Sequence, residues 1–247
     1  HKFGIPFEIP EEVEAEAKKV HDLPVTAEKR EDLRHLPIIA IDPRDARDFD
    51  DAVWATPDDD PKNTNGFKAI VAIADVSYYV RPGSALDREA AKRGNSVYFP
   101  DRVVPMLPHA LSSDKCSLRA NEDRAVLACH MQIDAGGHVT SWRFTRAIAR
   151  ISANIPYQDA QDAIDGKLDH PMLEPALKPL WACWDLLKKA RNRRGPLELN
   201  LPERRITLDD EGRVVGVAVR EHLDAHQVIE DFMIAANVAA AKALEEK

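Results

Sequence analysis

The sequence contains a dense cluster of carboxylates, in which five aspartates fall within ten residues: Asp42, Asp45, Asp48, Asp50 and Asp51. Like charges held a few ångströms apart repel one another, so a folded protein tolerates such crowding mainly where a cation or bound protons compensate. Short carboxylate side chains suit Mg²⁺, a hard ion that takes oxygen ligands and keeps waters that a phosphate can replace. The cluster therefore indicates a metal site for chemistry on phosphates.

A solvated acidic loop is the alternative interpretation, and it is the one we expect for Asp58-Asp59-Asp60, which stands among Pro and Asn residues. The earlier cluster differs because the apolar run Ile38 to Ile41 precedes it, Phe49 lies within it and Ala52-Val53-Trp54 follows it. These neighbours predict a segment held against the core. Residue chemistry alone leaves both interpretations of the cluster open.

Two other aspartate motifs fit less well. An EF-hand loop counted from Asp48 needs Gly at its sixth position and Glu at its twelfth, where this chain has Val53 and Asp59. The run Asp48 to Asp51 also resembles the acid motif of some terpene cyclases. Those are large helical proteins with aromatic-lined cavities, and a strand-rich chain with 6% aromatic residues does not match them.

Composition limits the class of protein. A chain of 247 residues with 44% apolar residues can bury the core of one large domain or two small ones. Its sequence shows neither an apolar run of membrane-spanning length nor an export signal. The cysteines lack CxxC spacing and are odd in number, which predicts reduced thiols in the cytoplasm: Cys116, Cys129 and Cys183. The net charge of −8 predicts that any nucleic-acid site is a local groove.

The elements that must position the aspartates can be read from local patterns. Pro10 to Val20 predicts a short helix with acids before lysines, and the polar stretch that follows, up to Arg34, suggests a linker. Ile38 to Ile41 and Phe67 to Val80 are β-branched or aromatic and predict buried strands.

Caps and turns mark the remaining elements. Ser84 is a suitable N-cap for a helix over residues 85–93 that Gly94 would end, and Gly136-Gly137 predicts a hairpin between strands at 125–133 and 138–151. The other expected elements are a hairpin around residues 209–212, an interrupted helix over 171–194 and a long helix over 224–246. Strands and helices without regular alternation favour an α+β fold, with helices packed on a mixed sheet.

The run IDPRDARDFDDAV resembles the signature of the RNB catalytic domain of the ribonuclease II and ribonuclease R exoribonucleases, most closely that of ribonuclease R. The resemblance extends over residues 38–247. Three more blocks continue it in order: VAIADVSYYVRPGSALDREAAKRGNSVYFPDRVVPMLPHALSSDKCSL, RAVLACHMQID and IEDFMIAANVAAAKAL.

This resemblance implies an enzyme that degrades single-stranded RNA from its 3′ end and releases nucleoside 5′-monophosphates, using Mg²⁺, which Mn²⁺ can replace, and an activated water. It assigns the four signature aspartates to Asp42, Asp48, Asp50 and Asp51. In a two-metal scheme we expect Asp42, Asp48 and Asp51 to act mainly as metal ligands. We expect Asp50 to position the water. Asp45 lies outside the set, with a solvated role.

The resemblance also places three residues at the RNA. Tyr98 would stack near the terminal nucleotide, and Glu230 would accept a hydrogen bond from the ribose 2′-hydroxyl, by which RNA is told from DNA. Leu199 stands where relatives have a stacking Phe, so that contact is weaker, because leucine offers no ring face.

The resemblance divides the chain into an N-terminal helix and linker, 1–36, and the first part of the catalytic domain, 37–247. The family's arginine block of the form TSPIRRY and its cold-shock and OB-fold RNA-binding modules do not occur in this sequence. We therefore expect a fragment that is inactive alone, monomeric, with no membrane and no obligate protein partner. The alternatives are a catalytically silent RNA-binding relative and a metal-dependent phosphatase or nuclease of unrelated fold.

Overall fold

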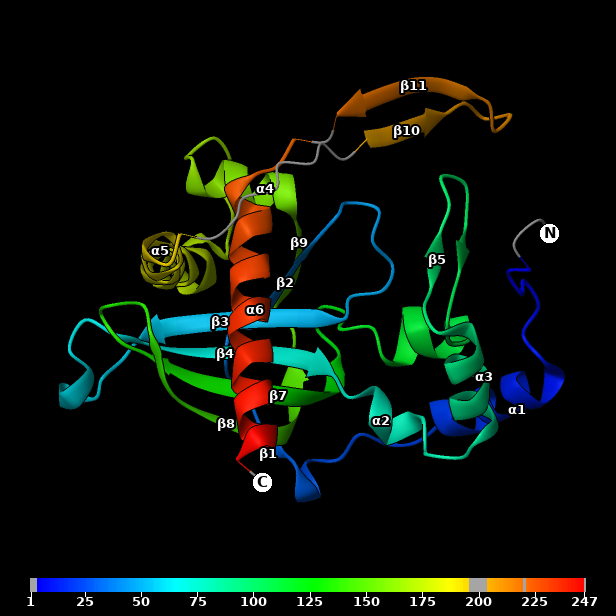
Figure 1. The fold of residues 1–247 in the computed structure, drawn as a ribbon, viewed down its shortest axis with the longest axis horizontal. Coiled ribbons are helices and arrows are strands. Elements are labelled where there is room, and N and C mark those ends of the chain that lie inside the picture. The colour runs from blue at the N-terminus through cyan, green and yellow to red at the C-terminus, as the bar shows by residue number, and fades with distance from the viewer. Residues whose placement is uncertain (1–3, 196–203, 220, 247) are drawn as a thin grey trace. The chain divides into compact units, whose positions relative to one another are not determined.

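The computed structural model describes residues 4–195, 204–219 and 221–246. The chain forms two compact units (Figure 1). The sheet unit consists of residues 25–75, 117–197 and 223–247, and the smaller unit of residues 1–24, 76–116 and 198–222.

The sheet unit is built on a seven-stranded sheet with the order β1-β8-β7-β4-β3-β2-β9. The inner neighbours pair antiparallel, whereas β1 pairs parallel with β8 and β2 parallel with β9 at the two edges. The strands are β1 (Glu31–Asp32), β2 (Ile39–Asp42), β3 (Asp51–Pro57), β4 (Phe67–Ala74), β7 (Asp123–Ile133), β8 (Val139–Arg150) and β9 (Ala153–Pro156). The predicted mixed sheet of an α+β fold is thereby confirmed.

Helices cover this sheet, with α6 crossing its strands in Figure 1. They are α4 (Tyr157–Ile164), a π-helical turn (Leu173–Leu177), α5 (Lys178–Arg193) and α6 (Asp224–Glu245). Alternate strand residues such as Val53, Val71 and Cys129 form one core with Trp184 and Phe232 of the helices. The strands that carry functional side chains therefore rest on a continuous packed layer.

The smaller unit joins α1 (Glu11–His21) to α3 (Ala85–Arg93), where the Leu86 amide donates a 2.9 Å hydrogen bond to the Glu16 carboxylate. Ser84 caps α3 by accepting a hydrogen bond from the Asp87 amide, and Gly94 ends the helix at φ +80°. Its other elements are α2 (Val76–Tyr79), β5 (Val97–Tyr98), β6 (Val103–Val104), a π-helical turn (Leu111–Lys115), β10 (Arg204–Leu208) and β11 (Val214–Val219).

The predicted helices near residues 10–20, 85–93 and 224–246 are confirmed, as are both hairpins. The prediction of one strand over Phe67 to Val80 is wrong in its second half, because β4 ends at Ala74 and α2 follows. Asp75 leaves the strand with its side chain 2% exposed and paired with Arg30 and Arg146. The Asp75 amide still donates a 2.9 Å hydrogen bond to the Ala125 carbonyl, and its ion-paired carboxylate stands at the point where β4 gives way to α2.

Two expectations about polar segments also need correction. The stretch up to Arg34 is not merely a linker, because it contains β1, and the Arg30 guanidinium donates to the buried Asp75 carboxylate at 2.8 Å. The loop at 58–60 is not fully solvated. The Asp58 side chain is buried and accepts hydrogen bonds from the Asn63 and Gln132 amides, at 2.9 and 2.8 Å.

Within the described ranges, no helix has the length and apolar character needed to cross a membrane. The cysteines are all buried and none is joined in a disulfide: Cys116, Cys129 and Cys183. This agrees with the predicted reduced thiols.

The hairpin glycine Gly137 allows close contact between the sheet and α5. A Cβ there would lie 2.0 Å from the Leu186 carbonyl oxygen, and its φ is +79°. Gly137→Ala should therefore destabilise the sheet unit by about 3 kcal/mol, from the left-handed backbone and the clash together. Urea unfolding followed by tryptophan fluorescence measures this, since all four tryptophans are in the sheet unit: Trp54, Trp142, Trp181 and Trp184.

Gly166→Ala is the matched control. Gly166 has φ +75°, but no atom lies within 4 Å of the position that a Cβ would take, so its substitution should cost only the backbone contribution of about 1 kcal/mol. Equal losses in the two variants would contradict the close approach at Gly137.

Candidate active site

The signature aspartates lie where β2 and β3 meet at one end of the sheet. Asp42 is the last residue of β2 and Asp51 the first residue of β3, while Asp48 and Asp50 lie in the loop between them. Because β2 and β3 are antiparallel neighbours, the chain that leaves β2 returns to the same end of the sheet. Their pairing brings the carboxylates together.

The pKa values report this proximity. Burial first, and then the charges of Asp51, Asp50 and Asp48, raise the pKa of Asp42 to about 7. Burial and the neighbouring Asp50 raise the pKa of Asp51 to about 6. The pKa of Asp50 is also raised, by burial and by Asp48. Asp45 is exposed and is not a cause of any of these shifts.

One oxygen of the cluster has no partner among the described residues. Asp42 Oδ2 is buried and forms no hydrogen bond with them. A buried carboxylate oxygen left this way carries the full cost of losing water, unless a proton or a cation satisfies it. The site therefore has a place for positive charge at the end of β2.

The donor set fits a hard divalent cation, since it consists of carboxylate oxygens. In the ranges that the structure describes, no three His, Cys, Asp or Glu side chains are arranged to hold an ion directly. Ion binding would therefore require these side chains to turn toward the ion, or waters to lie between them.

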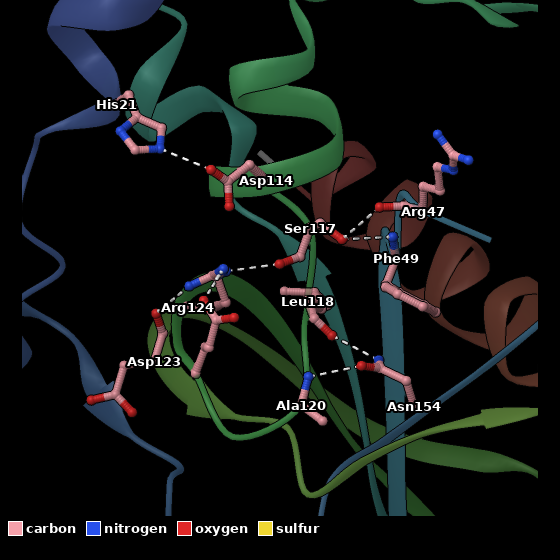
Figure 2. A network of polar contacts seen from close by, with 11 residues as sticks. His21, Arg47, Phe49, Asp114, Ser117, Leu118, Ala120, Asp123, Arg124 and Asn154 are labelled. Carbon is pink, nitrogen blue, oxygen red and sulfur yellow. Dashed lines mark hydrogen bonds and ion pairs between the residues drawn. The ribbon is translucent and has the colours of Figure 1, made fainter. Parts of the chain in front are cut away.

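The aspartate loop is attached to residues that the sequence analysis does not single out (Figure 2). The Ser117 hydroxyl accepts a hydrogen bond from the Phe49 amide at 3.0 Å and donates one to the Arg47 carbonyl at 3.3 Å. Arg124 and Asn154 in turn hold residues 117–120. Serine, arginine and asparagine are common in loops and strands alike, so nothing local in the sequence marks them.

The three residues expected at the RNA are placed as follows. Tyr98 is in β5 of the smaller unit, with 63% of its surface exposed. Glu230 is exposed on α6 of the sheet unit, and its carboxylate accepts a hydrogen bond from Gln227 Nε2 at 3.1 Å. Leu199 lies outside the described residues. Their roles at RNA stay predictions.

Comparison with known proteins finds the RNB domain family over residues 30–247. The chain is 41% identical to ribonuclease R of Vibrio parahaemolyticus and 39% identical to that of Escherichia coli, covering 98% of this chain and 29% and 28% of those proteins. The structure of Mycoplasma genitalium RNase R in complex with ribose methylated single-stranded RNA matches with a TM-score of 0.91 at 29% identity, over 98% of this chain and 38% of that one.

The chain thus spans less than a third of the length of these two curated relatives. The matched region contains the sheet, the helices that cover it and all four signature aspartates. This chain belongs to the RNB domain family.

Proposed function

We propose that this chain is part of the catalytic domain of a 3′-to-5′ exoribonuclease that hydrolyses single-stranded RNA to nucleoside 5′-monophosphates. The observation that carries the proposal is the carboxylate cluster, in which burial and neighbouring charges raise the pKa values of Asp42 and Asp51 and the buried Asp42 Oδ2 has no partner among the described residues. The relatives named ribonuclease R and the solved RNase R complex with single-stranded RNA support the reaction and substrate class.

Asp42, Asp48 and Asp51 would hold Mg²⁺, or Mn²⁺ in its place. When bound, such ions lower the pKa of an attacking water and stabilise the charge that develops on the leaving oxygen. Asp42, with its pKa of about 7, must give up its proton to become a ligand, so metal binding releases protons near neutral pH. The buried oxygen of Asp42 would then gain the partner that it lacks.

Asp50 is suited to a different task. Its residue is the most exposed of the four although its carboxyl group is partly desolvated, and its carbonyl accepts a 2.9 Å hydrogen bond from the Ala74 amide. A carboxylate held in this way but open to solvent can accept a hydrogen bond from a water and orient it toward the phosphate. We assign Asp50 to water positioning.

Residues outside the cluster would contact the RNA. The exposed Tyr98 ring can stack on a base of any sequence, and the exposed Glu230 carboxylate can accept a hydrogen bond from a 2′-hydroxyl. Leu199 would supply a weaker apolar contact. We further propose that residues 37–247 belong to the catalytic domain and follow a segment over 1–36, in a monomeric cytoplasmic protein.

A silent RNA-binding relative is the remaining alternative, and the presence of all four aspartates argues against it. Release of 5′-mononucleotides from RNA supports the enzyme, whereas binding without cleavage supports the silent relative. An unrelated phosphatase fold is wrong, since the chain has the RNB fold.

Mg²⁺ or Mn²⁺ should raise the melting temperature of the chain, because the ion binds the native cluster and not the unfolded chain. Asp48→Asn combined with Asp51→Asn should abolish the rise. Asp45→Asn combined with Asp59→Asn is the control that removes the same charge from exposed positions, and it should keep the rise. Differential scanning fluorimetry at increasing metal concentration gives the answer. An unchanged metal response in the first double variant would exclude these aspartates as the site.

The metal-free sheet unit should become less stable as pH rises from the ordinary aspartate pKa of about 4 to about 7. Raised pKa values mean that the folded state binds more protons than the unfolded state, so the stability from protonated Asp42 and Asp51 is lost as pH passes about 6 and 7. Asp42→Asn combined with Asp51→Asn should remove this slope. Urea unfolding in EDTA at a series of pH values tests it, and an unchanged slope in the variant would assign it to other groups.

In the full-length protein, Asp50→Asn should lower turnover at least ~10²-fold, the scale for losing one preorganised catalytic group. RNA affinity should stay nearly unchanged, because Asp50 is assigned to the water and not to the RNA. Single-turnover cleavage of end-labelled RNA measures the first, and fluorescence anisotropy the second. Asp45→Asn should cleave like the unaltered protein. Substantial cleavage by Asp50→Asn would remove Asp50 from the chemistry.

A further inference from the structure

Ser117 is a completely buried polar residue that faces the aspartate loop, with 0% of its surface exposed. A hydroxyl has one proton to donate and lone pairs to accept with. Ser117 uses both functions on the loop, accepting from the Phe49 amide at 3.0 Å and donating to the Arg47 carbonyl at 3.3 Å (Figure 2). One side-chain atom thereby binds the peptide groups on both sides of Asp48.

Holding those two peptide groups restricts the backbone from which the Asp48 side chain leaves. The backbone has two soft torsions at each residue, and both torsions of Asp48 lie between the peptide bonded at Arg47 and the peptide bonded at Phe49. With both peptide groups hydrogen-bonded to one buried oxygen, the range of directions open to the Cα–Cβ bond of Asp48 is narrowed. A further hydrogen bond joins the same segment to the loop, since the Leu118 amide donates to the Phe49 carbonyl at 2.8 Å.

The segment that holds the loop is itself held by the buried Arg124 and the half-buried Asn154. Arg124 Nε donates to the Ser117 carbonyl at 2.7 Å. Asn154 Nδ2 donates to the Leu118 carbonyl at 2.9 Å, and its Oδ1 accepts from the Ala120 amide at 2.8 Å. Asn154 lies on β9 opposite Ala40 of β2, the strand that ends at Asp42. The two ends of the carboxylate cluster are therefore connected through residues 117–120.

We propose that Ser117 is a positioning residue for the metal site, one that sets Asp48 against Asp42 and Asp51 without touching the ion or the RNA. This inference rests on the proposed metal-dependent function. Groups that orient metal ligands in this way typically change metal affinity or activity 10–100-fold when they are removed. A purely structural serine would lower stability and leave the metal affinity of the folded protein unchanged.

The test compares three variants of the full-length protein: Ser117→Ala, Asp48→Asn and Ile133→Val. Ile133 is a buried core residue of β7, so its substitution provides a loss of stability away from the loop. Mn²⁺ binding is measured by isothermal titration calorimetry without RNA, at a temperature where all three variants are folded. Cleavage kinetics and peptide-level hydrogen exchange over residues 43–53 accompany it.

Ser117→Ala should weaken Mn²⁺ binding at least ~10-fold and lower kcat by a similar factor, with KM for RNA unchanged. Exchange over residues 43–53 should quicken in the metal-free protein, because the Phe49 amide loses its acceptor. Ile133→Val should match the unaltered protein in all three measurements. If Ser117→Ala is too unstable to purify, Asn154→Ala removes the two bonds behind the loop and should weaken Mn²⁺ binding in the same direction.

Two results would overturn the proposal, and they differ. Mn²⁺ affinity in Ser117→Ala equal to that of Ile133→Val, while Asp48→Asn binds Mn²⁺ weakly, would make Ser117 merely structural and leave the proposed function intact. Unchanged Mn²⁺ affinity in Asp48→Asn would show instead that the proposed metal site is wrong, and the inference would fall with it.

Discussion

Repulsion among four carboxylates is the constraint that this fold must satisfy. Asp42, Asp50 and Asp51 would separate if they were free to do so, and the fold instead holds them where burial first, and then the charges of neighbouring aspartates, raise their pKa values. No local preference of the chain can impose this. The adjacency of β2 and β3, fixed by a core that extends to α5 and α6, holds the two strand ends in place.

Buried polar contacts add to the apolar core. α5 and α6 are tied by the buried Asp231 carboxylate, which accepts hydrogen bonds from Trp184 Nε1 at 2.8 Å and from the Arg191 guanidinium at 3.1 Å. Just after the central strand β4, the buried Asp75 carboxylate pairs with Arg30 and Arg146. Breaking one partner of such a buried pair leaves an uncompensated charge, so these contacts resist rearrangement around the site.

Features encoded by neighbouring residues were predictable from the sequence. Ser84 and Gly94 bound α3, Gly136-Gly137 turns a hairpin, and the aspartates are grouped within ten residues. Features that depend on distant partners were not. Asp75, at the end of β4, pairs with two arginines far away in the chain, and the parallel pairing of β1 with β8 joins residues more than a hundred positions apart. The support of the loop by Ser117 belongs to this second kind, since its partners lie about seventy residues away.

The choice of groups around the aspartate loop follows from the same constraint. A lysine or arginine directed at the carboxylates would relieve their repulsion, but it would also compete with the cation that the site needs. The hydroxyl of Ser117 and the amide of Asn154 carry no charge, so they can fix the backbone without lowering the affinity of the aspartates for a metal ion. Arg124 contributes from farther back, where its guanidinium donates to the Ser117 carbonyl and pairs with Glu122. Ser117 and Asn154 hold the loop without a charge of their own, and the charged Arg124 contacts the Ser117 carbonyl. The negative charge of the aspartates therefore stays available to bind a cation.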